Sequence, residues 1–141
     1  MSRTLHLGVL VQPYGNGRRA VTTGDVAGFL EDRYGVMAAF YRVHGTDVAR
    51  AVEDGLGGAL EALLMGQAVD PYGRAGAQIR QAFQRFILTR EAERVGIPGT
   101  PTLAAQRGVS HRKKHPYARR EPRPSFRDTG MYVNSFRAWV T

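Results

Sequence analysis

The chain has 141 residues and a mass of 15.5 kDa, which suits one domain with a core large enough to fold without cross-links. Hydrophobic residues make up 43% and charged residues 23%, as in globular proteins, and the absence of cysteine excludes a disulfide scaffold and a thiol nucleophile. The apolar runs are too short for a transmembrane helix, and the first residues lack a signal-peptide core. We therefore expect no membrane partner and a location in the cytoplasm or in a particle assembled there.

The net charge of +8 is concentrated in one segment near the C-terminus. Residues 107–127 hold eight arginine and lysine residues against one acid, Glu121, so this segment carries +7 and the rest of the chain only +1. A basic segment on a nearly neutral body favours an anionic partner, which is either a nucleic acid or an acidic protein surface.

Hydrophobic periodicity predicts three main helices in the middle of the chain. Their expected ranges are 25–43, 47–65 and about 75–94, with Gly45 and Gly66 ending the first two. The core is expected to contain large apolar residues of these helices: Phe29, Met37, Phe40, Leu60, Leu63, Phe83 and Phe86. If Leu60 is buried in this way, Leu60→Ala should cost about 2–5 kcal/mol.

Both ends of the chain predict short strands. Leu5, Leu7 and Val9 alternate with less apolar neighbours, and apolar residues alternate again over 136–141. Before the second strand, Asp128 is expected to cap one or two helical turns by accepting from the amides of Gly130 or Met131.

These elements predict an α+β fold that is mainly helical, with a small antiparallel sheet formed by the N- and C-terminal strands. Residues 1–108 are expected to form a helical core domain with the N-terminal strand, including a short helix at 102–107. Residues 109–127, named the basic arm here, lack periodicity and contain three prolines, so we expect an extended segment that orders against a partner. Residues 128–141 are expected to pack on the core or on a neighbouring subunit, where either terminal strand can also add to a neighbour's sheet.

No pattern for catalysis, metal binding or cofactor binding is found. The glycine-rich cluster at 55–58 lies within a helical stripe and lacks the Gly-Lys-Ser/Thr of a phosphate loop, so it indicates close helix packing or a weak point in the helix. His111 and His115 have a metal-binding helical spacing, but their basic neighbours and Pro116 disfavour both a helix and a cation. The acids of 47–65 fit a solvated helix face. We expect a protein that is not an enzyme.

Aromatic residues accompany the basic residues of the arm. Tyr117 and Phe126 flank its arginine and lysine residues, and this combination suits either single-stranded nucleic acid or anchoring on an acidic protein surface. The candidate partner contacts are the basic, aromatic and C-terminal residues of this region: Arg112, Lys113, Lys114, Tyr117, Arg119, Arg120, Arg123, Phe126, Asp128, Thr129, Gly130, Phe136 and Trp139.

The sequence DTGMYVNSF at 128–136 resembles a C-terminal signature of tailed-phage neck and tail-completion proteins. In that signature, aspartate, threonine and glycine precede a short helix that ends in Ser-Ile or Ser-Phe. Residues 25–37, 96–102, 115–118 and 122–126 are also similar to segments of a phage morphogenesis family, so the resemblance covers most of the chain.

The resemblance implies a virion structural protein of the head–tail neck, present in the host cytoplasm during assembly. Such proteins form a homo-oligomeric ring, with a hexamer favoured over a dodecamer, between portal-side proteins and the tail tube, and packaged DNA passes through it. The family commonly has a long mid-chain β-hairpin where this chain predicts helix, which leaves open a tail-completion protein, a head-closure protein or another connector component. The alternative is a nucleic-acid-binding accessory protein acting through residues 107–127.

Overall fold

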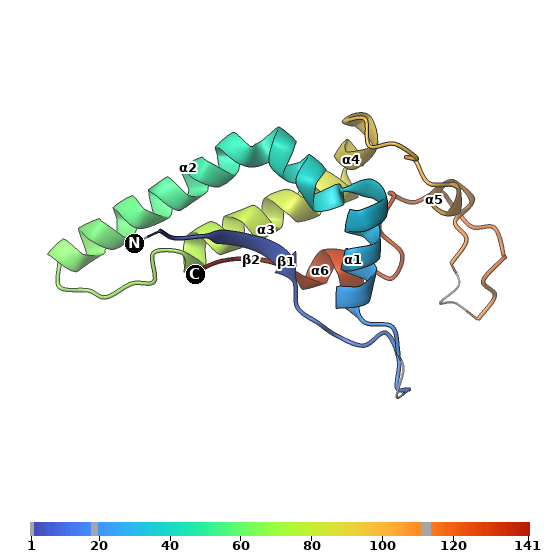
Figure 1. The fold of residues 1–141 in the computed structure, drawn as a ribbon, viewed down its shortest axis with the longest axis horizontal. Helices are drawn as coiled ribbons and strands as arrows, with labels where there is room; N and C mark the ends of the chain where they lie inside the picture. Colours follow the sequence, from blue (N-terminus) through green and yellow to red (C-terminus); the bar gives the residue numbers. More distant parts are fainter. Residues whose placement is uncertain (1, 18–19, 111–113) are drawn as a thin grey trace.

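The computed structural model describes residues 2–17, 20–110 and 114–141. The described elements, in chain order, are β1 (Leu5–Val9), α1 (Thr23–Tyr34), α2 (Val36–Leu64), α3 (Gly73–Leu88), α4 (Glu91–Arg94), α5 (Leu103–Arg107), α6 (Met131–Ser135) and β2 (Phe136–Val140). Figure 1 shows an elongated molecule in which α2 and α3 run along the length, while α5 lies at the opposite end from the C-terminal end of α2. The predicted α+β, mainly helical fold is confirmed.

The two chain ends form the predicted sheet. β1 and β2 pair antiparallel, with Leu5 opposite Val140 and Val9 opposite Phe136. Backbone hydrogen bonds extend the ladder by one residue at each end. This pairing brings residues 128–141 back to the N-terminal part of the chain and fixes where α6 lies, because β2 follows α6 without a loop.

The first helix boundary differs from the prediction. We expected a helix over 25–43 that ends near Gly45, but the chain breaks at Gly35, whose φ of 60° and ψ of 47° are left-handed. Glycine takes this conformation at little cost because it has no Cβ, and it commonly ends helices for that reason. Gly45 instead lies inside α2, which continues for 29 residues.

The third predicted helix is divided in the same way. α3 ends at Leu88, and a left-handed residue, Arg90, with φ of 62°, separates it from the short α4. The Arg90 guanidinium donates to the carbonyl oxygen of Pro122 at 3.3 Å and lies 3.6 Å from the Glu93 carboxylate. The turn between α3 and α4 is therefore in contact with the basic arm.

The core lies between α2, α3 and the C-terminal elements. The side chains of Phe40, Phe83, Phe86 and Phe136 are each 0% exposed, and Phe83 stacks on Phe136 with ring centroids 3.9 Å apart. Met37 is partly buried at the edge of this cluster. The predicted burial of Phe40, Phe83 and Phe86 is thus confirmed.

Three of the predicted core residues are exposed instead. Phe29 and Leu60 are each 60% exposed and Leu63 is 64% exposed. Helical spacing identifies an apolar face, but it does not say whether another part of the chain covers that face. In the described chain, α3 packs against the other side of α2, where Val48 and Ala51 are buried.

Candidate assembly surface

The basic arm contains no helix or strand in its described part, residues 109–110 and 114–127, yet it is ordered on its own chain. The backbone N–H of Arg120 donates to the carbonyl oxygen of Arg107 at 3.1 Å, and that of Arg123 donates to Ala105 at 3.0 Å. These bonds hold the arm along α5. We expected this segment to order against a partner, whereas residues 120–123 make these backbone hydrogen bonds to their own chain.

Arg123 is the main side-chain anchor of the arm. Its guanidinium donates to the carbonyl oxygens of Ala104 and Val109 at 2.8 and 3.0 Å, and it lies 3.6 Å from a carboxylate oxygen of Asp128. These contacts satisfy carbonyl groups at the end of α5, where a cation is also favoured by the helix dipole. We therefore assign Arg123 to the fold rather than to partner binding.

A second anchor joins the arm to α4 and α1. One carboxylate oxygen of Glu93 accepts from both the backbone N–H and the hydroxyl of Ser125, at 2.8 and 2.9 Å. The next residue, Phe126, packs edge-on against Tyr34 with ring centroids 5.1 Å apart. Phe126 thus contacts its own chain, and the pair from Glu93 to Ser125 was not predicted because 32 residues separate them.

Asp128 does not cap the short C-terminal helix, and this prediction is wrong. The N-cap of α6 is Gly130, whose φ of 87° is left-handed, and no side chain in the described part of the protein caps it. The Met131 N–H instead lies 3.4 Å from the Thr129 hydroxyl. Asp128 precedes the cap by two residues, so its carboxylate turns to the start of the arm and accepts from the Ser110 hydroxyl at 2.7 Å.

We expect Asp128→Ala to loosen the arm while α6 stays intact. The substitution removes the hydrogen bond from Ser110 and the carboxylate beside Arg123, at a cost of about 1 kcal/mol. Trypsin cleavage within residues 114–120 should become faster, and circular dichroism should show unchanged helix content. Asp128→Asn, which keeps an acceptor for Ser110, should have the smaller effect, whereas lost helix content without faster cleavage would restore the capping interpretation.

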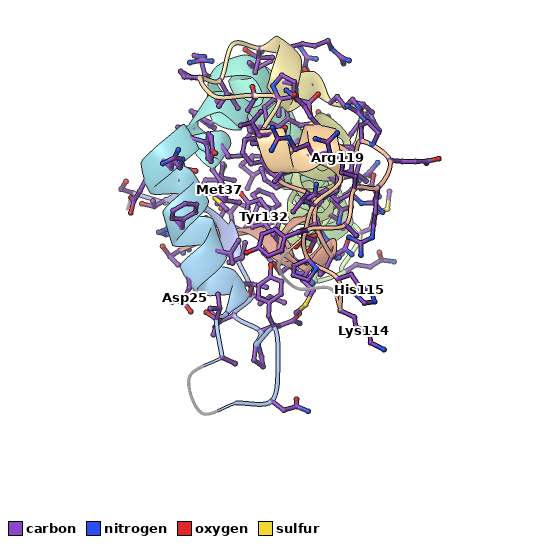
Figure 2. The ribbon with its side chains drawn as sticks, turned by 90° about the vertical axis from the view of Figure 1, so that its right-hand side faces the viewer. Asp25, Met37, Lys114, His115, Arg119 and Tyr132 are labelled. Carbon is purple, nitrogen blue, oxygen red and sulfur yellow. The ribbon has the colours of Figure 1, made fainter. Side chains whose placement is uncertain are left out.

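The part of the arm that remains exposed is its tip, defined here as Lys114, Tyr117 and Arg119. Tyr117 is 76% exposed, and the two cations are also on the surface. Figure 2 shows Lys114 at the outer edge of the arm, directed away from the body. The predicted contacts Arg112 and Lys113 precede this tip and lie outside the described residues.

The remaining predicted contact residues are spread over the molecule. The Arg120 guanidinium donates to the carbonyl oxygen of His115 at 3.1 Å and so stiffens the tip from inside. Phe136 is fully buried in the core of its own chain, so its predicted role as a partner contact is not supported by its position. Trp139 is partly exposed on the sheet, where it stacks on His6 with ring centroids 5.3 Å apart.

A small cavity of about 110 Å³ lies beside the Asp128-Thr129-Gly130 turn. Tyr132, which Figure 2 labels, lines this cavity with a buried side chain. Its hydroxyl has no hydrogen-bond partner among the described residues. Burial raises the pKa of Tyr132 above its ordinary value, and the charge of Glu31 adds to the effect. In the described part of the chain, no cluster of three or more histidine, aspartate or glutamate residues suits a metal ion.

The raised pKa of Tyr132 predicts a loss of stability in alkali. The unfolded chain releases this proton near pH 10 while the folded chain retains it, so the stabilising contribution is complete below that pH and decreases above it. The free energy of unfolding of Tyr132→Phe should therefore decrease less steeply between about pH 10 and 11.5, by roughly 1.4 kcal/mol per pH unit. Equal slopes for Tyr132→Phe and the native chain would contradict the assignment.

One exposed surface was missed by the sequence analysis. The end of α2 and the residue that follows it carry an apolar strip, named the α2 strip here and formed by Leu56, Leu60, Leu63, Leu64 and Met65. Their exposed fractions range from 44% to 81%. The helical spacing of these apolar residues already indicated one apolar face, but we interpreted that face as part of the core.

Searches for similar proteins returned no matching family model, no matching curated protein and no matching solved structure. Among the described residues, none of the helices combines the length and the apolar character that crossing a bilayer requires.

Proposed function

We propose that the protein is a structural subunit of the head–tail neck of a tailed phage, a tail-completion or connector subunit located in the virion. The observation that carries this proposal is the local structure of residues 128–136. Asp128-Thr129-Gly130 leads directly into α6, which ends at Ser135, and Phe136 begins β2. This order agrees with the signature of the resembling family, in which the short helix ends in Ser-Ile or Ser-Phe.

The shape and surfaces of the chain are consistent with a ring subunit. A ring buries two different surfaces of every subunit, one against each neighbour. The chain presents exposed apolar residues on α2 and exposed cations on the arm tip, and these lie on different elements. The proposed partners are further copies of this chain, other neck proteins, portal-side and tail-tube proteins, and packaged DNA in the channel.

The test is the location of the protein in the particle. Electron microscopy of virions with a labelled C-terminus should show density at the junction of head and tail, and particles that lack the protein should contain heads and tails that are not joined. Label found on the capsid surface or the tail tip, or joined particles without the protein, would overturn the proposal.

The basic arm provides a second test in the same particles. Replacing Arg112, Lys113 and Lys114 by serine should leave the melting temperature unchanged and reduce incorporation into particles. A matched control removes the same charge from exposed arginines outside the arm: Arg3→Ser, Arg74→Ser and Arg85→Ser. Equal incorporation of the two triple variants would show that the arm has no special role in assembly.

The second candidate function is nucleic-acid binding through residues 107–127. The exposure of Lys114 and Arg119 beside Tyr117 favours it, because cations contact phosphates and an exposed ring stacks on bases. Its test is the salt dependence of DNA binding by the isolated protein, where log K should fall with a slope of about −0.9 per phosphate contact on duplex DNA. Tight, salt-sensitive binding, together with normal particle assembly by the triple serine variant, would favour this candidate over the neck subunit.

A further inference from the structure

The α2 strip is an apolar surface that the described residues of its own chain leave uncovered. Leu56 and Leu60 are four residues apart and Leu63 follows three residues later, so these side chains lie on one face of the helix. A neighbouring face of the helix, which includes Val48 and Gly55, is buried against α3 and the turn before it. An exposed apolar patch of this kind typically marks a protein–protein contact.

The same end of the molecule is acidic. Residues 47–70 contain five aspartate and glutamate residues and one basic residue, Arg50. Of these acids, Glu53 and Glu61 are exposed on α2 and form no hydrogen bond or ion pair within the described chain. The α2 strip is therefore flanked by carboxylates that are available to a partner, and the net charge of this region favours a basic partner.

The opposite end of the molecule has the complementary character. The arm tip presents Lys114 and Arg119 around the exposed ring of Tyr117, and Leu103 on α5 is also exposed. Figure 1 places α5 and the arm at one end of the long axis and the C-terminal end of α2 at the other. Because the two surfaces lie at opposite ends, they do not meet within one chain.

We propose that the α2 strip of one copy binds the arm tip of the next copy. Glu53 and Glu61 would face Lys114 and Arg119, and the leucines of the strip would cover the Tyr117 ring. This occupant is favoured over a two-fold pairing of α2 strips, because two-fold pairing brings like carboxylates together, which costs several kcal/mol at an interface.

The contact is heterologous, since it joins two different surfaces, and repeated contacts of this type give a ring when the rotation closes. The proposal thus deepens the ring function proposed above and rests on it for its biological setting. The contact itself is tested on the purified full-length protein, so it can succeed or fail independently of where the protein lies in a particle.

Cysteine cross-linking tests the geometry directly, because the chain has no cysteine of its own. The double variant Leu60→Cys/Tyr117→Cys should give a ladder of covalent oligomers under mild oxidation, and each single variant should not. The matched control is Phe29→Cys/Tyr117→Cys, since Phe29 is as exposed as Leu60 but lies on α1. A ladder from the control pair instead, or dimers from Leu60→Cys alone, would overturn the proposal.

Charge reversal tests the electrostatic complementarity. Glu53→Lys/Glu61→Lys should weaken self-association in sedimentation experiments by about tenfold or more, and so should Lys114→Glu/Arg119→Glu, because each puts like charges at the contact. All four side chains are exposed, so the variants should melt like the native chain. An equimolar mixture of the two variants should associate again, because each acidic surface then meets a basic one. Undiminished association of either variant alone, or no recovery in the mixture, would overturn the proposal.

The outcomes separate this contact from the proposed function. If the cross-linked ladder and the mixture both behave as expected but the label is absent from the neck, the contact stands and the neck function fails. If the label lies at the neck but neither experiment detects the contact, the neck function stands and the contact is wrong.

Discussion

Phe83→Ala should lower the free energy of unfolding by about 3–5 kcal/mol, the range typical of a buried phenylalanine. The Phe83 side chain is 0% exposed and lies at the centre of the aromatic cluster. Its ring stacks on Phe136 at 3.9 Å and meets Phe40 edge-on at 5.3 Å, so the substitution removes contacts that join α2, α3 and β2 at once. Alanine leaves a cavity that rigid neighbours on three elements cannot fill completely.

Leu60→Ala is the matched control for this prediction. It also truncates an apolar side chain, on α2 instead of α3, but the Leu60 side chain is 60% exposed. We therefore expect its free energy of unfolding to change by no more than about 0.5 kcal/mol, not by the 2–5 kcal/mol expected from a buried leucine. Urea denaturation of both variants measures the two changes, at a protein concentration at which sedimentation shows the monomer, so that self-association through the α2 strip does not contribute to stability. Similar losses for Phe83→Ala and Leu60→Ala would mean that the end of α2 is covered in the isolated protein and that the core assignment is wrong.

The number and type of the main elements were predictable from the sequence, because periodicity reports directly on helix and strand. The helix boundaries were less so. Gly35 and Gly45 are both glycines within apolar periodic segments, and the sequence does not distinguish them. The structure distinguishes the two glycines. Phe40, Val48 and Ala51 are buried on one continuous face of α2, so the helix continues past Gly45. At Gly35 the backbone is left-handed, and the chain turns there between α1 and α2.

The charge of the basic arm was visible in the sequence, but its order was not. The contacts that hold the arm are Glu93 with Ser125 and Ser110 with Asp128, and they join residues 32 and 18 positions apart. Composition and local spacing carry no information about such pairs. The same reasoning explains why we wrongly predicted that Asp128 caps α6. Asp128 has a residue type that suits an N-cap and lies close to the start of the helix. Its carboxylate instead accepts from Ser110, a contact that the sequence does not reveal.

The glycine-rich cluster at 55–58 supports a last prediction, in which neighbouring glycines give opposite results. Gly55 is buried where α2 meets the turn before α3, and a Cβ at this position would clash with the backbone carbonyl oxygen of Pro71. A backbone atom cannot move aside as a flexible side chain can, so Gly55→Ala should lower the free energy of unfolding by about 1–3 kcal/mol, even though alanine is the better helix former.

Gly57→Ala is the matched control because a Cβ there would have no atom within 4 Å outside its own helix. Alanine restricts the unfolded chain and favours the helix, so this variant should be more stable by about 0.5–1 kcal/mol. Opposite signs, measured by urea denaturation at one pH, would identify Gly55 alone as the position of close approach and leave the other glycines as weak points in the helix. If both variants gained stability, the contact between α2 and Pro71 would be looser than the structure has it. The glycine cluster would then be a weak point in the helix and not a position of close helix packing.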